Sequence, residues 1–280
     1  MRYREYYPQT PLSRFVECFW TLESDTTPDP NQPERILPDG CTELILNYGA
    51  EFQQHNEGKK TLQPRNFLVG QMTGPILISP IGIVSLLGIR FHPGGTSPFF
   101  RIPMCEVTDQ VVELGGLASD LEQELLEVSV DQPSMIEKIE AVKSSLTSYV
   151  LRFKHDSWIA GLAAKIVESG GVVAVDELAG DAGISSRQLE RRFLREIGVG
   201  PKLLSRILRF QQVFRAVERS DTAWASVALE CGYYDQAHLI RDFNQFAQQT
   251  PAVLFAAQSQ LTEAFTRKTR TSNFSNTDQF

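Results

Sequence analysis

Residues that build metal and redox sites are scarce in this chain of 280 residues, which contains four cysteines and four histidines. The cysteines lie far apart and form no C-x-x-C motif: Cys18, Cys41, Cys105 and Cys231. The histidines show no metal-ligand spacing: His55, His92, His155 and His238. We therefore expect no metal site, no cofactor and free, buried thiols. The alternative is a reactive sensor cysteine, for which Cys18 and Cys41 are the candidates.

Long apolar runs and catalytic motifs are also missing. No run approaches the ~20 residues of a membrane span, and the N-terminal MRYREYYPQTPLSRF lacks the apolar core of a signal peptide. We expect a cytoplasmic protein without membrane contact. The sequence contains no G-x-S-x-G, H-E-x-x-H or phosphate-loop motif. This argues against the enzyme classes that those motifs define, and we expect that the protein is not an enzyme.

The segment 185–197, SSRQLERRFLREI, carries two faces at helical spacing. Apolar residues recur every four positions on one face: Leu189, Phe193 and Ile197. Arginines recur every four positions on another: Arg187, Arg191 and Arg195. Ser185 and Gln188 have the spacing of a capping box, and Gly198 suits a C-terminal stop. Such a helix fits a DNA groove, although a solvated arginine face is the plainer interpretation of one copy.

A second segment, 234–248 (YDQAHLIRDFNQFAQ), has a similar layout and favours the DNA interpretation. Four positions recur at an offset of 50 residues: Leu189 and Leu239, Arg191 and Arg241, Phe193 and Phe243, Pro201 and Pro251. Upstream the offset is 49, linking Ala179 to Ala228 and Gly183 to Gly232. Asp235 is a suitable N-cap. This repeat predicts two helix-turn-helix units, each with a glycine turn before a capped helix.

The segment between the two units, 201–219, predicts a long connecting helix. Pro201 suits the first helical position, and a mostly apolar stripe follows. About 18 residues at ~1.5 Å rise span roughly 27 Å. This length is near the ~34 Å between successive major grooves on one face of DNA. We expect the connecting helix to hold both capped helices over one site.

Residues 158–258 resemble the DNA-binding domain of the AraC/XylS family of bacterial transcription regulators. The resemblance is carried by DELAGDAGISSRQLERRF and by ALECGYYDQAHLIRDFNQFAQQTP. It implies a sequence-specific transcriptional regulator that binds double-stranded DNA and contacts RNA polymerase. An activator is what the family usually implies, and repression remains open.

The family pattern also implies which side chains contact DNA. The expected residues are Ser186, Arg187, Gln188, Arg191, Arg192, Arg195, Gln236, Ala237, His238 and Arg241. Arginine pairs with guanine and glutamine with adenine, each worth roughly 1–3 kcal/mol of discrimination. Arg192 and Arg195 are expected at phosphates. Ala237 departs from the polar residue usual there, so we expect the second helix to read fewer bases. For His238 a phosphate contact and a buried, hydrogen-bonded ring remain open, and Glu190 either accepts from cytosine or orients an arginine.

The charge distribution is unusual for a DNA-binding protein, because the net charge is −7. Residues 1–150 carry 11 Lys and Arg against 20 Asp and Glu, whereas residues 151–260 carry 13 against 12. Positive charge must therefore be concentrated on one face of the C-terminal part. We expect modest nonspecific affinity for DNA, which the acidic N-terminal part lowers further.

The N-terminal part predicts closely spaced short strands, in 12–22, 36–49, 67–71 and 75–95, with 52–66 as an exposed connection. We expect a mainly-β barrel or roll, cupin-like by analogy, that senses a small-molecule effector or a partner. Two of its segments, LPDGCTELILNYG and GIRFHPGGTSPFFRIPMCEVTDQVVEL, resemble the N-terminal domain of one branch of AraC-like regulators. Arg90 and His92 alternate onto one strand face. They either contact an anionic ligand or form a strand-end pair that faces solvent or caps a loop.

Helical periodicity follows from Leu114, and a break at 131–133 predicts two amphipathic helices. They either pack on the β domain or pair between protomers of a homodimer. The expected α+β organisation is a β-rich sensor domain over 1–113, a helical linker over 114–154, a DNA-binding domain over 155–258 and a disordered tail over 259–280.

Two other classes of function remain open. One is an enzyme in which a cupin-like domain does chemistry and the helical domain targets it to DNA. The other is a constitutive DNA-binding protein whose N-terminal domain is purely structural, which predicts no response to a ligand.

Overall fold

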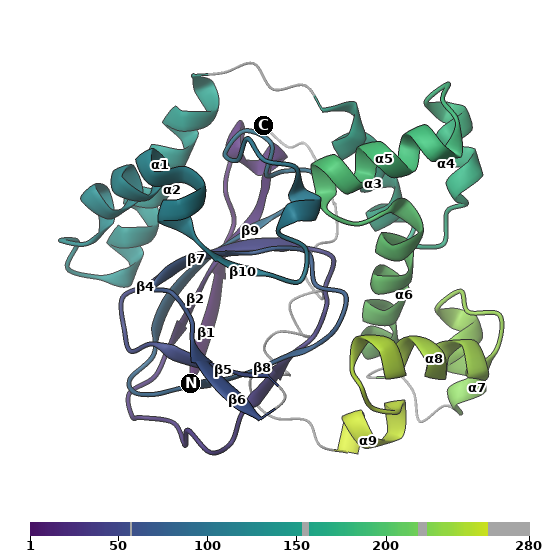
Figure 1. Ribbon diagram of the computed structural model, residues 1–280, viewed down its shortest axis with the longest axis horizontal. Coiled ribbons are helices and arrows are strands. Elements are labelled where there is room, and N and C mark those ends of the chain that lie inside the picture. Colours follow the sequence, from purple (N-terminus) through teal and green to yellow (C-terminus); the bar gives the residue numbers. More distant parts are fainter. Residues whose placement is uncertain (57, 153–156, 218–222, 257–280) are drawn as a thin grey trace, which may run out of the picture.

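The computed structural model describes residues 1–56, 58–152, 157–217 and 223–256. It shows a β-rich N-terminal part followed by a helical C-terminal part, which confirms the predicted α+β class (Figure 1). Among the described residues, no helix has both the length and the apolar character needed to cross a membrane. The expected disordered tail over 259–280 lies outside the described residues, as do the last two positions, 153 and 154, of the expected helical linker.

The strands of the described residues form two antiparallel sheets. The six-stranded sheet has the order β1 (Arg2–Tyr6), β2 (Val16–Glu23), β9 (Ser85–Phe91), β4 (Thr42–Asn47), β7 (Asn66–Val69) and β10 (Val111–Glu113). The four-stranded sheet has the order β3 (Glu34–Ile36), β8 (Ile76–Pro80), β5 (Phe52–Asn56) and β6 (Lys59–Leu62). Within the described ranges the ladders leave two separate sheets rather than one closed ring. The arrangement is thus a two-sheet roll.

Strand alternation buries the six-stranded sheet on both faces. On β2, Phe19 packs into one apolar cluster and Trp20 into another on the opposite face. Trp20 lies across the backbone of Gly88 on β9, where a Cβ atom would come 2.0 Å from the indole. The second face meets Phe52 and Ile78 of the four-stranded sheet. Successive side chains of a strand point to opposite faces, so a continuous run of apolar residues is what this doubly covered sheet requires.

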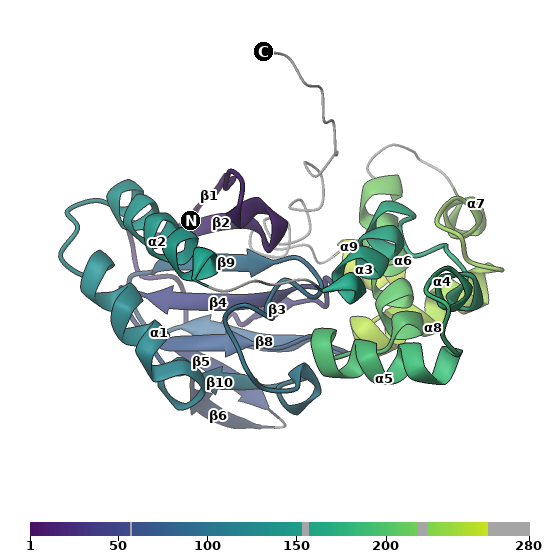
Figure 2. The same ribbon diagram turned by 90° about the horizontal axis from the view of Figure 1, so that it is seen from above.

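Two helices cover the other face of the six-stranded sheet. These are α1 (Leu114–Ser129), which is kinked at Ala118, and α2 (Met135–Leu151). Their apolar stripes join the cluster that contains Phe19: Leu121, Leu125, Ile139, Val142, Leu146 and Val150. Figure 2 shows both helices at one side of the sheets and the C-terminal helices at the other. Of the two alternatives from the sequence, the structure shows packing on the β domain.

The C-terminal part consists of two small helical cores that share one long helix. The first core contains α3 (Trp158–Glu168), α4 (Val175–Asp181) and α5 (Ser186–Ile197). The second contains α7 (Trp224–Glu230), α8 (Gln236–Phe246) and α9 (Pro251–Ala256). The long helix α6 (Pro201–Val217) contributes Leu204 to the first core and Phe210 to the second. The predicted helix-turn-helix duplication is confirmed.

Two predictions about the N-terminal part were wrong. The expected exposed connection at 52–66 contains the hairpin β5–β6, which pairs Gln53 with Leu62. Its polar sequence hid it, because β6 is exposed along its length at the sheet edge. The expected strand at 12–22 begins instead with a short 3-10 helix, Leu12–Arg14, and the strand runs from Val16 to Glu23.

Candidate nucleic-acid interface

The first capped helix, α5, begins and ends as its sequence predicts. The Ser185 backbone N–H donates to Gln188 Oε1 at 3.0 Å, and the Gln188 N–H donates to Ser185 Oγ at 3.3 Å, which completes the capping box. Gly198 ends the helix in the left-handed region with φ 100°, and Gly183 provides the preceding turn with φ 64°. These caps satisfy backbone groups that a helix end leaves without partners.

Burial of the apolar stripe fixes which face of α5 points outward. The buried side chains are those of Leu189, Phe193 and Ile197. Arg187 and Arg191 are exposed on the opposite face, and no acidic side chain of the described residues pairs with either. Arg192 is also exposed and has only a distant carboxylate, Glu196 Oε1 at 4.0 Å. Guanidinium groups held this way on a rigid helix remain available for DNA.

Two expected contact residues of α5 already have internal partners. The side-chain oxygen of Gln188 accepts from Ser185 in the capping box, so its amide group is left as the donor for DNA. Ser186 Oγ donates to Asp176 Oδ1 at 2.8 Å, which links the start of α5 to α4. Bidentate reading of adenine needs both ends of a carboxamide. Gln188 therefore cannot read adenine with both ends of its carboxamide while its oxygen stays bonded in the cap.

The last expected arginine of α5 lies apart from the others. Arg195 is exposed but lines a crevice of about 190 Å³ with Phe100 and Met104 of the N-terminal part. Glu190 lies over Gly200, where a Cβ atom would come 2.1 Å from its carboxylate. The structure thus groups Arg187 and Arg191 toward the start of the helix and places Arg195 at the boundary between the two parts.

The second capped helix, α8, repeats this construction. The His238 N–H donates to Asp235 Oδ1 at 2.7 Å, which confirms Asp235 as the N-cap, and Gly232 has φ 76° in the turn. The buried stripe consists of Leu239, Phe243 and Phe246. The ring of His238 meets that of Tyr233 edge-on with centroids 5.1 Å apart, and His238 is half-buried.

The exposed face of α8 carries fewer polar groups than that of α5. Gln236, Ala237 and Arg241 are all exposed. Arg241 Nε donates to the Ala237 carbonyl oxygen at 3.3 Å, so the backbone orients this guanidinium. Tyr234, which the sequence reasoning missed, is 87% exposed in the turn directly before Asp235. The sequence did contain a signal for Tyr234. The turn before α8 is one residue longer than the turn before α5, and Tyr234 lies in this longer turn.

Polar contacts hold the two units to the connecting helix. Arg206 of α6 donates to Asp242 of α8 at 2.6 Å. Arg209 of α6 donates to the Gly171 carbonyl of the first unit at 2.9 Å, and its guanidinium lies over the Tyr233 ring of the second unit. Figure 1 shows that α5 and α8 both turn their C-terminal ends toward the sheets. The two helices therefore present their capped, N-terminal ends on the same side of the helical part.

A second candidate site is an apolar cavity of about 70 Å³ between the two sheets. Its walls are formed mainly by aromatic and aliphatic side chains, such as those of Trp20, Ile45, Phe52 and Ile78. Two acidic residues, Asp39 and Glu43, are also part of its lining. A cavity of this size admits a few waters or a small organic group.

The two carboxylates of the cavity enclose a buried cation. Arg90 Nη2 lies 3.0 Å from Asp39 Oδ2 and 2.7 Å from Glu43 Oε1, with a side chain that is 4% exposed. Burial alone would lower the pKa of Arg90, but Glu43 and Asp39 hold that pKa above its usual value. His92 lies beyond the end of β9 and bonds through its backbone to Phe15 and Gly95. Arg90 is thus an internal partner of two carboxylates, and the backbone of His92 closes a turn.

The cysteines give no sign of a reactive thiol in the interior. All four are free, and among them Cys105 is exposed. Burial, together with the nearby Asp39 and Glu17, raises the pKa of the Cys41 thiol well above its usual value. Burial raises the pKa of Cys231 to about 11. A thiolate is the nucleophilic form, so these two thiols are held in the unreactive form at neutral pH. The described residues also contain no group of three or more His, Cys, Asp or Glu side chains that could hold a metal ion.

Comparison with known proteins agrees with the C-terminal geometry. Residues 178–257 match the model of a helix-turn-helix domain, and residues 4–113 match a domain of unknown function, DUF6597. No curated protein matches the chain. Together with the two capped helices and the shared α6, the first match shows that the C-terminal part is an AraC-type helix-turn-helix domain. The protein is a DNA-binding transcription regulator.

Solved structures in which the chain follows a similar course have low sequence identity to this protein. A structure of ToxT from Vibrio cholerae is 9% identical, with a TM-score of 0.42, and the match covers 84% of this chain and 97% of that one. ToxT with a bound unsaturated fatty acid is 12% identical, with a TM-score of 0.41 over 84% and 92% of the two chains. The AraC-like activator CuxR is 12% identical, with a TM-score of 0.26 over 78% and 87%.

Proposed function

We propose that the protein activates transcription from specific operators in the cytoplasm, by contact with RNA polymerase, and that an effector in the N-terminal part modulates it. The main support for DNA recognition is that Arg187 and Arg191 are exposed on a helix whose opposite face is buried. Ser186, Gln188 and Arg192 flank this pair, and Gln236, Ala237, His238 and Arg241 form the second contact surface. Arg195 is assigned to phosphate at the edge of the site. The activator role follows the AraC resemblance of the sequence.

The proposed domain limits are 1–113 for a β-rich sensor domain, 114–154 for a helical linker or dimerisation region and 155–258 for the DNA-binding domain. One chain carries both recognition helices, so a monomer is sufficient for one two-part operator. If α1 and α2 pair between protomers, they do so through their outer surfaces, because their shared apolar stripe is buried.

The test is selection of binding sites from random DNA, followed by single substitutions. Arg187→Ala and Arg191→Ala are each expected to weaken binding to the selected site by roughly tenfold or more, and binding to random DNA by much less. The matched control is Arg65→Ala, an arginine of the N-terminal part that bonds within its own domain. Equal losses on selected and random DNA would show that both arginines only hold phosphate.

The effector is proposed to be small and apolar, with a hydrogen-bond donor or a cationic group. The cavity walls are mostly apolar, and two of the lining residues, Asp39 and Glu43, share the single guanidinium of Arg90, so the surplus charge of this group is negative. Such a group favours a donor and disfavours a carboxylate ligand. The segment 34–41 supports coupling to DNA, because Leu37 lines the cavity and also lies in the second helical core.

A thermal-shift comparison tests this effector class. Isobutylamine is expected to raise the melting temperature of the whole protein, and isobutyrate, which has the same carbon skeleton, is not. Ile78→Phe, which fills part of the cavity, is expected to abolish the shift. No shift with either compound would favour the constitutive alternative with a structural N-terminal domain.

A further inference from the structure

The N-terminal part bonds to both recognition helices at the same place, the residue that ends each helix. Thr108 Oγ1 donates to the carbonyl oxygen of Gly198, the C-cap of α5, at 2.7 Å. Arg35 Nη1 donates to the carbonyl oxygen of Ala247, the C-cap of α8, at 2.9 Å. The last carbonyl groups of a helix have no partner within the helix and carry partial negative charge. A hydroxyl donor and a cationic donor from another domain are suited to both positions.

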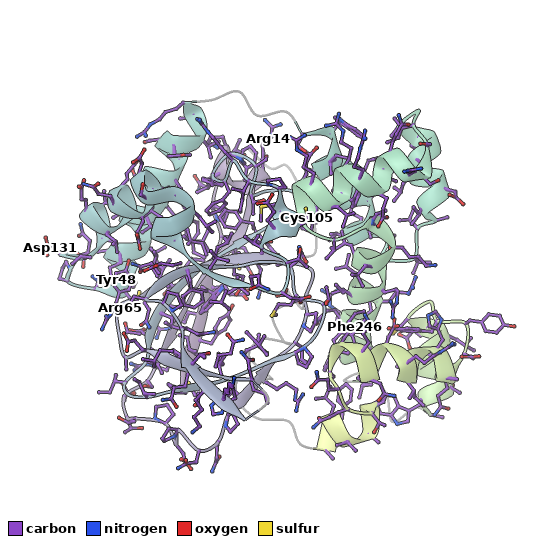
Figure 3. All side chains as sticks on the ribbon, viewed as in Figure 1. Arg14, Tyr48, Arg65, Cys105, Asp131 and Phe246 are labelled. Atoms are coloured by element: carbon purple, nitrogen blue, oxygen red, sulfur yellow. The ribbon has the colours of Figure 1, made fainter. Side chains whose placement is uncertain are left out.

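The contact at Gly198 leaves little room for a side chain. A Cβ atom there would lie 3.0 Å from Thr108 Oγ1 and 3.1 Å from the carbonyl oxygen of Met104. Met104 belongs to a short 3-10 helix, Met104–Glu106, that packs on the end of α5. Cys105 of this helix is labelled beside the end of α5 in Figure 3, and Phe246 marks the last turn of α8. The glycine stop of α5 thus serves a second purpose, close approach of the N-terminal part.

A third contact holds the middle of the connecting helix. Gln211 Nε2 of α6 donates to the Pro38 carbonyl oxygen at 2.5 Å, and Gln211 is buried. Leu37 beside it packs among Ile207 and Phe210. The bond from Arg209 of α6 to the Gly171 carbonyl oxygen ties the first unit to the same helix. The angle between the two units is therefore held by α6 and also by the N-terminal part, which bonds to both units and to α6.

These contacts of the N-terminal part leave the N-terminal ends of α5 and α8 uncovered. Arg187 and Gln236 lie in the first turns of α5 and α8, both are exposed, and the domain contacts lie at the opposite ends. A domain that blocked DNA would have to cover these first turns. Held at their C-terminal ends, the helices keep a fixed separation while their N-terminal ends remain free for the major groove.

We propose that Arg35 and Thr108 are positioning residues that set the separation of the two recognition helices, and so decide which spacing between the two halves of an operator is bound. This rests on the proposed function, because it requires that both helices read DNA. The N-terminal part then acts on DNA choice without touching DNA.

The test measures binding of the full chain to the selected operator, to the same operator lengthened or shortened by one base pair, and to a single half-site. Wild type is expected to lose about tenfold in affinity when the spacing changes, because a rigid pair cannot follow the shifted half-site. The double variant Arg35→Ala with Thr108→Val should bind all three spacings within about threefold of one another, since two donors are removed. Its affinity for the single half-site should match that of wild type.

Conservative variants separate positioning from general damage. Thr108→Ser and Arg35→Lys keep a donor and should retain the wild-type spacing profile, as should the control Arg65→Ala. A double variant that keeps the wild-type profile, or that loses affinity equally for every DNA including the half-site, overturns the proposal. Failure of wild type to select any DNA sequence would instead overturn the proposed function, so the two failures are distinct.

Discussion

Arg206 on the connecting helix donates a 2.6 Å bond to Asp242 on the second recognition helix, and Asp242 is 1% exposed. A second bond from the same nitrogen reaches Gln245 Oε1, also at 2.6 Å. The guanidinium lies over the ring of Phe246. This polar contact lies on the buried side of α8, and it fixes the rotation of the helix so that Arg241 faces outward.

The ion pair between Arg206 and Asp242 predicts that removing either side chain destabilises the protein by a different amount. Arg206→Ala leaves the Asp242 carboxylate buried without its partner and should lower the free energy of unfolding by about 3 kcal/mol. Asp242→Ala leaves Arg206, which is partly exposed and can turn toward water, and should cost about 1–2 kcal/mol. Urea unfolding of the full chain measures both values, with Asn244→Ala on the exposed face as the control. The opposite order would contradict the assignment of Asp242 as the buried partner.

Substitution of Arg241 should affect one half of the operator. Arg241→Ala is expected to remove protection of the second half-site in a footprint while protection of the first remains. The loss in affinity should be about fivefold to tenfold, below that of Arg191→Ala, because Ala237 beside it provides no hydrogen bond. Equal weakening of both halves would show that α5 and α8 do not read separate sites.

Addition of a methyl group at Gly88 should distort the doubly covered sheet. In Gly88→Ala the new Cβ atom would come 2.0 Å from the Trp20 indole, so the ring must leave its place across the strand. Such overpacking costs about 1–3 kcal/mol. The fluorescence of Trp20 should shift toward that of an exposed indole, and Gly116→Ala, where a Cβ atom meets nothing within 4 Å, is the control. An unchanged spectrum and stability would contradict the packing.

The thiols should differ in reactivity and in their response to pH. Native protein at pH 8 is expected to react with iodoacetamide first at Cys105, because Cys105 is exposed and Cys18 and Cys231 are buried. Burial raises the pKa of Cys231 in the folded state to about 11, above the usual thiol value of 9.0. The folded state therefore keeps this proton between pH 9 and 11 while the unfolded state loses it, and stability should fall as pH rises through that range. Cys231→Ala should show a smaller fall than wild type, and an identical fall would rule out Cys231 as its source.

Several features of this protein follow from local sequence alone. The spacing of the apolar residues and the identity of the cap residues predict α5 and α8, because both signals lie within a few positions of one another in the chain. The cap residues Ser185, Gln188 and Asp235 and the glycines at 183, 198 and 232 are all recognisable in the sequence. The 50-residue repeat determined that there are two such units.

Other features depend on contacts between residues that are distant in the chain. The hairpin β5–β6 was missed because β6 is exposed along its length, and only its pairing with β5, which itself pairs with β8, makes it a strand. The enclosure of Arg90 by Asp39 and Glu43 joins three strands or loops that no spacing rule connects. The bonds of Thr108 to Gly198 and of Arg35 to Ala247 span 90 and 212 residues. Sequence therefore determined what each recognition helix is, and tertiary packing decided what holds the pair, because a helix end accepts any donor that the rest of the fold brings to it.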